Sequence, residues 1–321
     1  MHVLVAGGAG YIGSHTAKAL AAAGHVPVVF DSLEKGHREA VRWGPLAQGD
    51  LADPAALEAA FRDYPIDGVI HFAAYIAVGE SMKEPVRYFR NNVANTLNLV
   101  EAMLRADVRR IVFSSTAAVY GDPEEVPIPE DHPLRPVSVY GESKLMVERM
   151  LEWFGATAGL RSARLRYFNA AGCDPDGETG EDHEPETHLI PLALAAAAGK
   201  RSHLDLYGTD YPTADGTCIR DYIHVGDLAS AHIRALDYLA ERDRNLTANL
   251  GTGSGVTVRE VLRTVEEVTG LPVPVLEKPR RDGDPISLVA DSRRAQAELG
   301  WTPRHSSLRE IVDTAWRWYR R

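Results

Sequence analysis

Short apolar runs of strand length alternate with helical stretches over the first half of the chain. Six of these runs are predicted strands, near residues 2–6, 26–30, 45–50, 68–72, 110–115 and 162–168. Helical periodicity predicts one helix after the first run and others near 54–62, 85–105 and 137–155. Strands that alternate with helices in this way are typical of a parallel sheet wound on both faces by right-handed crossovers. The predicted fold class is therefore α/β, with a doubly wound parallel sheet.

The pattern changes after about residue 170. Residues 173–185 are rich in Gly, Asp, Glu and Pro, which indicates a long surface loop, and 208–218 reads as a second one. Helices are predicted near 187–199, 226–241, 257–269, 291–299 and 307–319, and short strands near 203–207, 247–250, 273–276 and 287–290. We therefore expect a first domain over 1–170, whose edge recruits segments near 220–250, and a smaller α/β lobe over 171–321.

The first predicted strand leads into a glycine turn, Gly7-x-x-Gly10-x-x-Gly13, that precedes a predicted helix. A helix N-terminus carries roughly half a positive charge and unpaired N–H groups, so it suits a pyrophosphate. Glycines let the phosphates approach the turn and let the helix pack on the strand. Asp31 ends the second strand, where its carboxylate can accept hydrogen bonds from both adenine-ribose hydroxyls and repel a 2′-phosphate. The sequence predicts a Rossmann domain that binds NAD rather than NADP.

Tyr140 and Lys144 are four residues apart near the start of a predicted helix, so they lie on one helix face. A phenol with a pKa of about 10 is a poor base at neutral pH. An ammonium ~6 Å away favours the phenolate by roughly 2.8 kcal/mol at an effective dielectric constant of about 20. We therefore expect Lys144 and the positive ring of NAD⁺ to lower the pKa of Tyr140. Ser114, Ser115 and Thr116 end the fifth strand, and a hydroxyl there can relay a substrate proton to Tyr140.

Composition narrows the function classes. The chain of 321 residues is 45% hydrophobic and carries a net charge of -10, which argues against nucleic acid or an anionic membrane surface as a partner. Its two cysteines, Cys173 and Cys218, cannot form a disulfide framework, and no zinc-ligand cluster is apparent, so no metal is expected. The most apolar run, 192–198, is shorter than the ~18 residues of a membrane span. Because the glycine turn interrupts the N-terminal apolar segment, we expect no signal peptide and a cytoplasmic protein.

Together these motifs resemble the extended short-chain dehydrogenase/reductase family. The resemblance rests on the glycine turn, Asp31, the 114–116 hydroxyls, Tyr140-x-x-x-Lys144 and Tyr167-Phe168-Asn169. Three longer stretches, 7–16, 77–81 and 210–225, resemble the UDP-glucose 4-epimerase (UDP-galactose 4-epimerase) branch of that family. The likeness covers essentially the whole chain, and 210–225 is its most specific part.

The resemblance implies an activity, a cofactor and a partner. Bound NAD⁺ would take a hydride from C4 of UDP-glucose or UDP-galactose while Tyr140, helped by Thr116, takes the proton of the 4-hydroxyl. The 4-keto sugar would then rotate, and the hydride would return to its other face. The family also implies a homodimer, joined through the helices near 85–105 and 137–155.

The resemblance further assigns residues to the two ligands. Around NAD it places Gly7, Gly10, Tyr11, Ile12, Gly13, Asp31, Ser32, Leu33, Lys35, Gly36, Asp50, Leu51, Phe72, Ala73, Ala74, Asn92, Ser114, Tyr140, Lys144 and Phe168. Around the nucleotide sugar it places Thr116, Tyr140, Asn169, His188, Leu189, Tyr207, Arg220, Arg281, Asp284 and Leu288. The two arginines would meet the diphosphate and ribose region, because guanidinium groups suit phosphate oxygens.

Some positions depart from the family pattern. Ile76 falls where some members carry a lysine in the cofactor pocket, so one cofactor contact is in doubt. Leu288 matches a position that is tyrosine in members restricted to glucose and galactose, and small in members that admit N-acetyl sugars. Leucine is intermediate in size, which raises the hypothesis of a side activity on UDP-N-acetylhexosamines.

Other functions remain open. A nucleotide-sugar 4,6-dehydratase needs an acid and a base, supplied in that family by an Asp-Glu pair after the strand-five threonine; here those positions are Ala117 and Ala118. A decarboxylase or a reductase on the same scaffold would not explain the 210–225 stretch. A non-catalytic NAD-sensing protein is the alternative from another class. Such a protein has no need of Thr116, Tyr140 and Lys144 together.

Overall fold

A seven-stranded parallel sheet forms the centre of the first half of the molecule in the computed structural model, which describes residues 1–281 and 283–321. Its strand order is β11-β6-β5-β4-β1-β2-β3. The bounds are β1 (His2–Ala6), β2 (Val26–Asp31), β3 (Leu46–Gln48), β4 (Gly68–His71), β5 (Arg110–Thr116), β6 (Arg161–Tyr167) and β11 (Leu246–Leu250). The order reverses at β1, as in doubly wound folds. The predicted α/β class is confirmed, and the seventh strand comes from the second half of the chain.

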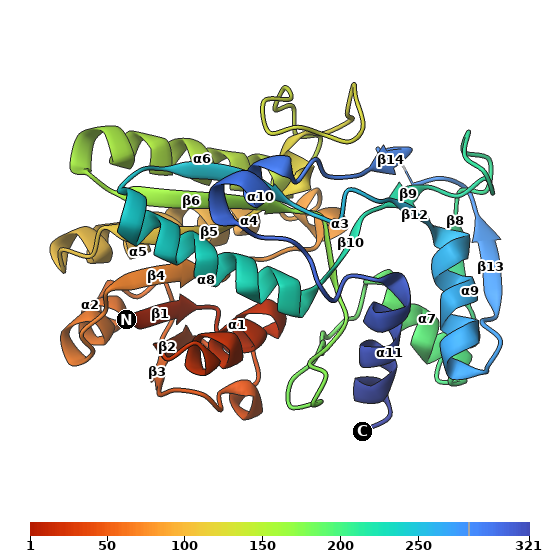
Figure 1. Cartoon of the computed structure of the whole chain (residues 1–321), viewed down its shortest axis with the longest axis horizontal. Helices are drawn as coiled ribbons and strands as arrows, with labels where there is room; N and C mark the ends of the chain where they lie inside the picture. The colour runs from red at the N-terminus through yellow and green to blue at the C-terminus, as the bar shows by residue number, and fades with distance from the viewer. Residues whose placement is uncertain (282) are drawn as a thin grey trace.

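Alternate residues of β1 serve two separate hydrophobic cores, because successive side chains of a strand point to opposite faces. Val3 and Val5 pack in the core covered by α1 (Tyr11–Ala22) and α8 (Val225–Arg242), whereas Leu4 and Ala6 pack in the opposite core. The opposite face is covered by α2 (Pro54–Asp63), α5 (Asn95–Arg105) and α6 (Val139–Ala158). Figure 1 shows α1 and α8 together on one side of the sheet.

The long helix predicted near 85–105 is continuous but not uniform. It consists of α4 (Pro85–Tyr88), a π-helical turn η2 (Phe89–Ala94) and α5. Short π-helical turns are often found at functional sites, and this one carries Asn92, whose contacts are described below. The sequence pattern could not show this turn, because periodicity over a few residues does not separate the two helix types.

The second half of the chain builds a smaller lobe around three helices. They are α7 (Leu189–Ala197), α9 (Val258–Thr269) and α11 (Leu308–Tyr319), which share one core and lie together on the right of Figure 1. The lobe also holds the parallel pair β8 (Leu204–Tyr207) and β13 (Val275–Lys278), and the small sheet of β12 (Val256–Thr257), β9 (Ile219–Arg220) and β14 (Ser287–Leu288). In contrast, α10 (Arg293–Leu299) packs against α8 and β11.

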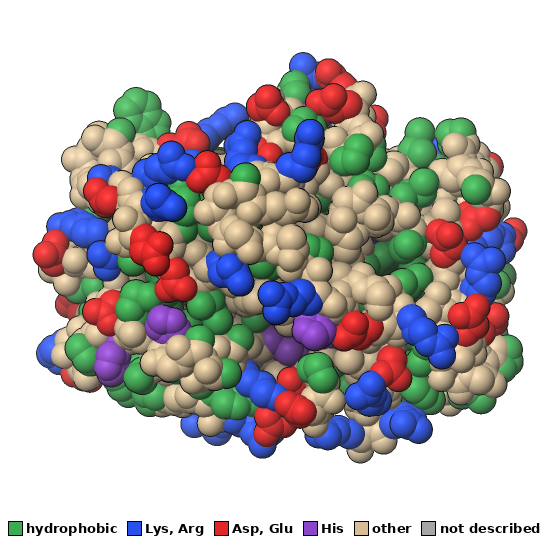
Figure 2. Space-filling model, in the orientation of Figure 1, with side chains coloured by type: hydrophobic (Ala, Val, Ile, Leu, Met, Phe, Trp, Pro, Cys, Tyr) green, Lys and Arg blue, Asp and Glu red, His purple; other side chains and the backbone are tan. Residues whose placement is uncertain are grey.

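Several short elements have no counterpart in the predicted pattern. The strand β7 (Asn169–Ala171) follows β6 and pairs with β10 (Tyr222–His224), which precedes α8, so the pair joins two distant parts of the chain. The others include β9, β12, α3 (Val78–Ser81) and the 3₁₀ turns η1 (Arg38–Ala40) and η3 (Ala117–Val119). No helix among the described residues has the length and apolar character that a membrane crossing requires. Figure 2 shows basic and acidic side chains interspersed over one face.

Candidate active site

The glycine turn between β1 and α1 is packed too tightly for larger residues at two of its three glycines. Gly7 has a φ of +80°, and a Cβ there would lie 2.6 Å from the backbone nitrogen of Ala73. A Cβ on Gly13 would lie 2.1 Å from the Gly7 carbonyl oxygen. Gly10, the residue before α1, is different, because its Cβ would meet only the Gly7 oxygen, at 3.4 Å. The first and last glycines therefore serve packing, and Gly10 leaves the start of α1 open to a ligand.

The residues after the turn connect it to the second half of the molecule. The Tyr11 hydroxyl donates a hydrogen bond to the Gly172 carbonyl, and burial raises the pKa of this phenol. Ile12 packs against the core under α1 and α8. Tyr11 thus holds the beginning of α1 against the segment that follows β7.

Asp31 lies at the carboxyl end of β2, beside the glycine turn. One carboxylate oxygen accepts the N–H of Ala9 at 2.9 Å and the other accepts the N–H of Leu33 at 2.9 Å. Burial raises the pKa of this carboxyl, and the two backbone donors offset part of the rise. A Cβ on Gly36 would lie 2.9 Å from the carboxylate, so glycine is needed there. The carboxylate is fixed in place and keeps free lone pairs for ribose hydroxyls.

The other residues predicted around NAD follow the strand ends on either side. Ser32 accepts the N–H of Glu34 at 3.3 Å, and Lys35 donates to the Glu184 carbonyl at 3.1 Å. The segment after β4 contains Phe72, Ala73 and Ala74, and the segment after β3 contains Asp50 and Leu51.

Asn92 lies in the π-helical turn, and its buried side chain is fully engaged. Its amide accepts the N–H of Tyr75 at 2.9 Å and donates to the Tyr75 carbonyl at 3.0 Å and to the Ser143 hydroxyl at 3.1 Å. These contacts position the segment after β4 and the start of α6.

The predicted catalytic residues meet where β5 ends and α6 begins. Thr116 is the last residue of β5, and its hydroxyl lies within hydrogen-bonding reach of the Tyr140 phenol. The ammonium of Lys144 donates to the Ser114 carbonyl at 2.8 Å and lies 4.9 Å from the centre of the Phe113 ring. Lys144 is buried and Tyr140 is half-buried. The Ser114 hydroxyl is hydrogen-bonded to the Tyr167 hydroxyl.

Two caps fix the first turn of α6, which carries Tyr140. Ser138 accepts the N–H of Gly141 at 3.1 Å, and Ser81 from α3 accepts the N–H of Tyr140 itself at 3.1 Å. A side chain that accepts a free N–H of the first turn stabilises the start of a helix. The tyrosine backbone is therefore anchored from two directions.

Lys144 alone does not lower the pKa of Tyr140 in this structure, and the predicted joint effect of Lys144 and NAD⁺ stays a prediction. Burial raises the pKa of the Tyr140 phenol, and the hydrogen bond from Thr116 lowers it only in part. Burial also lowers the pKa of Lys144, to about 7. The reason for the discrepancy is desolvation, which disfavours the charged forms of both groups and which a Coulomb estimate between exposed charges leaves out.

The predicted sugar-nucleotide residues of the second lobe form an arginine pair around one carboxylate. Arg220 is buried and pairs with one oxygen of Asp284, and Arg281 donates to the other at 2.8 Å. The Arg281 guanidinium lies 5.3 Å from the centre of the Tyr207 ring, and Tyr207 is exposed. Arg220, Arg281 and Asp284 thus form a connected group of two cations and one anion, which carries excess positive charge.

The remaining predicted residues belong to several different elements. The Asn169 side chain donates to the Asp221 carbonyl at 3.1 Å. Leu288 and Phe168 pack on the small core that contains Ala117. His188 precedes α7, and Leu189 is the first residue of that helix.

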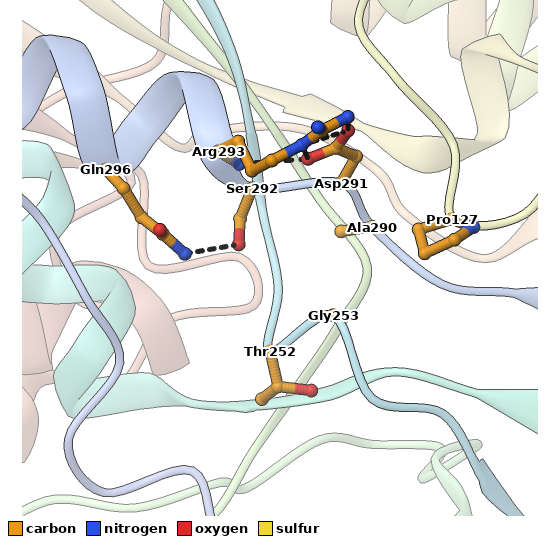
Figure 3. A pocket seen from close by; sticks show the side chains of 8 residues that line it. All are labelled: Pro127, Thr252, Gly253, Ala290, Asp291, Ser292, Arg293 and Gln296. Atoms are coloured by element: carbon orange, nitrogen blue, oxygen red, sulfur yellow. Dashed lines mark hydrogen bonds and ion pairs between the residues drawn. The ribbon is translucent and has the colours of Figure 1, made fainter.

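A hollow of about 330 Å³ lies elsewhere, between β11, β14 and α10. Figure 3 shows the residues that line it: Pro127, Thr252, Gly253, Ala290, Asp291, Ser292, Arg293 and Gln296. None is a predicted site residue, and its one arginine, Arg293, is paired with Asp291 at its rim.

Residues 3–251 match the model of the NAD dependent epimerase/dehydratase family. The chain belongs to this family. The matched region includes the glycine turn, Asp31, Thr116, Tyr140 and Lys144.

Individual members of the epimerase/dehydratase family resemble the chain over its whole length. The UDP-glucose 4-epimerase of Halalkalibacterium halodurans is 49% identical over 320 residues, covering 100% of this chain and 96% of that protein. The one from Azospirillum brasilense is 53% identical over 319 residues, covering 99% and 92%. The crystal structure of the Brucella ovis UDP-glucose 4-epimerase in complex with NAD has a TM-score of 0.97 at 50% identity, covering 98% and 97% of the two chains.

Sequence reasoning missed a buried ion pair that supports the catalytic region of this epimerase/dehydratase family member. Glu148 and Arg166 are both buried, and an Arg166 nitrogen donates to Glu148 at 2.6 Å. The Ser115 hydroxyl also donates to Glu148. The signal was available in the spacing, because Glu148 follows Tyr140 and Lys144 at four-residue steps on α6 and so shares their face.

Proposed function

We propose that the protein interconverts UDP-glucose and UDP-galactose by NAD-dependent epimerisation at C4. The observation that carries the proposal is the similarity of about 50% over nearly the full length to proteins named UDP-glucose 4-epimerase. This similarity covers both the domain that contains the seven-stranded sheet and the second lobe. The Thr116, Tyr140 and Lys144 group supports it, because a non-catalytic relative would not need three such groups together.

Tyr140 is the proposed acid–base group. The Thr116 hydroxyl lies near enough to this phenol to lower its pKa, so a substrate hydroxyl placed beside both could pass its proton to the tyrosine. Because burial holds the phenol protonated, positive charge near Tyr140 is needed to favour the phenolate. Lys144 is fixed by the Ser114 carbonyl and supplies part of that charge when protonated.

NAD is the proposed cofactor, and the described residues fit it. The open start of α1 at Gly10 suits its pyrophosphate, and the fixed carboxylate of Asp31 suits its adenine ribose. When bound, NAD⁺ would accept the hydride from C4 and, once reduced, would return it to C4. Gly10 would admit the phosphates, Gly7 and Gly13 let the turn pack closely, and Asn92 holds the neighbouring segment in position.

Arg220 and Arg281 are proposed to hold the diphosphate of the nucleotide sugar. Both pair with Asp284, which fixes the forks of the two guanidinium groups. One carboxylate between two arginines leaves a local positive charge for phosphate oxygens. A firmly held nucleotide lets the keto sugar turn without leaving the site.

The test is incubation of the purified protein with UDP-galactose, without added NAD, while UDP-glucose is followed. Conversion would support both the reaction and a cofactor that stays bound during purification. Absence of conversion, even with NAD supplied, would refute the 4-epimerase proposal. UDP-glucuronate and dTDP-glucose in parallel would then identify another nucleotide-sugar reaction.

We also infer that the protein forms a homodimer through α5 and α6. Exposed apolar side chains on these helices support it: Leu97 is 43% exposed, Met146 39% and Trp153 71%. Light scattering with size-exclusion chromatography should give twice the mass of one chain. Leu97→Glu together with Met146→Glu should give the monomer mass, and Leu271→Glu, in the second lobe, should leave the dimer intact. A wild-type monomer would contradict the inference.

A further inference from the structure

Four side chains of one loop converge beside the glycine turn. They are Glu181, His183, Glu186 and His188, and one ligand-type atom from each lies within 4.8 Å of all the others. His188 Nδ1 lies 2.9 Å from Glu181 Oε1 and 2.9 Å from Glu186 Oε1. His183 Nδ1 lies 3.4 Å from Glu181 Oε1 and 3.4 Å from Glu186 Oε2.

Two buried atoms of this cluster make no hydrogen bond of normal geometry to the described residues. The Glu181 side chain is only 5% exposed, and its Oε1 faces the two histidine nitrogens of the cluster without making a hydrogen bond of normal geometry to any described residue. His183 Nδ1, also buried, has none in the same part of the chain. Both atoms point into the cluster. Buried polar groups are normally paired, so unpaired ones that face each other indicate a missing ligand.

A neighbouring acidic cluster provides a direct comparison. Asp174, Asp176 and Glu178 also lie close together, but the ammonium of Lys18 contacts each of them at 2.8 Å. That cluster therefore holds its own cation. Among the described residues, no lysine or arginine is paired with Glu181 or Glu186.

We propose that Glu181, His183, Glu186 and His188 bind one zinc-type divalent ion. Two imidazole nitrogens and two carboxylate oxygens are ligands that Zn²⁺ takes in four-coordinate sites, whereas Mg²⁺ and Ca²⁺ prefer oxygen alone. Ligand atoms about 2.1 Å from a tetrahedral ion lie about 3.4 Å from one another, close to the separations in the cluster. All four protein ligands are present, so the site is structural rather than catalytic.

The ion would hold the loop against both halves of the molecule. The His183 ring packs edge-on against Tyr11, with centroids 6.0 Å apart, and Trp318 of α11 donates to the Glu181 carbonyl at 3.0 Å. His188 directly precedes α7, and in this proposal it binds the ion rather than the nucleotide sugar, where the family resemblance had placed it. The metal would therefore connect the start of α1, the start of α7 and the end of α11. It takes no part in the proton transfers at Tyr140.

The test measures metal retention by the untagged, full-length protein with its cofactor. The protein is dialysed against EDTA, incubated with ZnCl₂ or MgCl₂, desalted and analysed for metal. About one zinc per chain should remain, and no magnesium. ZnCl₂ should also raise the melting temperature, and EDTA should reverse that rise. No retained zinc, or equal retention of zinc and magnesium, would overturn the proposal.

Two variants and a control assign the site. His183→Gln and Glu181→Gln should each weaken zinc binding by about tenfold or more, because each removes a ligand. His203→Gln, which removes an exposed histidine outside the cluster, should retain zinc like the wild type. If both ligand variants keep the wild-type zinc content, the ion binds elsewhere and the proposal fails. Loss of stability without any zinc bound to the wild type would indicate a plain ion-pair cluster. None of these readouts depends on epimerase activity.

Discussion

Tyr140 has an environment that keeps its proton on, although its proposed role is to accept one. Burial raises its pKa and also lowers the pKa of Lys144 to about 7. A charge brought near the two residues would therefore change the protonation state of both. The spacing of Tyr140 and Lys144 therefore does not by itself set the pKa of the phenol; the surroundings of the pair do.

Tyr140→Phe should lower kcat by about 10² to 10⁴-fold, because general acid–base groups contribute rate factors of that size. NAD content, read from the absorbance of the cofactor released on denaturation, should stay at the wild-type level. Tyr64→Phe, a half-buried tyrosine beyond α2, is the matched control and should keep full activity. Full activity in Tyr140→Phe would refute its assignment as the base.

Leu288→Ala should raise kcat/KM for UDP-N-acetylglucosamine relative to UDP-galactose by about tenfold, since removing methylenes from a pocket changes discrimination by about this factor. Leu288 packs on the same small core as Leu134. Leu134→Ala removes an equal volume from that core outside the proposed site, so it should leave the sugar preference unchanged. If neither the wild type nor Leu288→Ala turns over the acetylated sugar, the side activity is refuted.

The glycine turn separates a packing role from a binding role within one element. Gly13→Ala should destabilise the protein, since its Cβ would lie 2.1 Å from the Gly7 oxygen. Gly10→Ala should keep a near-wild-type melting temperature, because its Cβ meets only one atom, at 3.4 Å. It should nevertheless weaken NAD binding, because the methyl group would project toward the phosphates. Thermal unfolding and NAD titration distinguish the two; equal melting temperatures for both variants would contradict this division.

At the scale of elements, apolar periodicity predicted most of the fold. The long elements, such as α6 and β5, lie within about three residues of their predicted ends, because a buried face imposes a regular repeat over many positions. The strands β7 and β10 were missed, since three residues carry no measurable period. Their pairing depends on contacts between segments about fifty residues apart.

The candidate site was less predictable than the fold. The positions of Asp31, Thr116 and Tyr140 at strand or helix ends follow from local pattern. The direction of the Tyr140 pKa did not, because it depends on burial by neighbours distant in sequence. The sequence analysis also missed the cluster of Glu181 and His183, because it considered cysteines as the sign of a metal site. The roles assigned to the site residues stay predictions.

Three buried histidines, His15, His71 and His232, lower the stability of the whole molecule at low pH. Burial lowers the pKa of His15 to about 4, of His71 to about 3 and of His232 to about 4. In the unfolded chain the same groups take up protons near pH 6.5. Between pH 6.5 and 4 the unfolded state therefore binds more protons, and the free energy of unfolding falls as the pH falls.

The expected slope is roughly 1.4 kcal/mol per pH unit for each histidine in that range. Urea unfolding at several pH values measures it. His232→Phe keeps a planar ring against Phe72, so it should remove about one third of the slope contributed by the three histidines. An unchanged slope in His232→Phe would show that this residue does not contribute.

The place of β11 in the sheet has a consequence for synthesis on the ribosome. β6 is complete when residue 167 has been made, but its outer neighbour is β11, which ends at Leu250. For about eighty residues of translation, the nascent sheet therefore has an open edge beside the core that α8 later covers. Open strand edges next to exposed apolar surface favour aggregation. The emerging chain should depend on chaperones until its last sheet strand has left the exit tunnel.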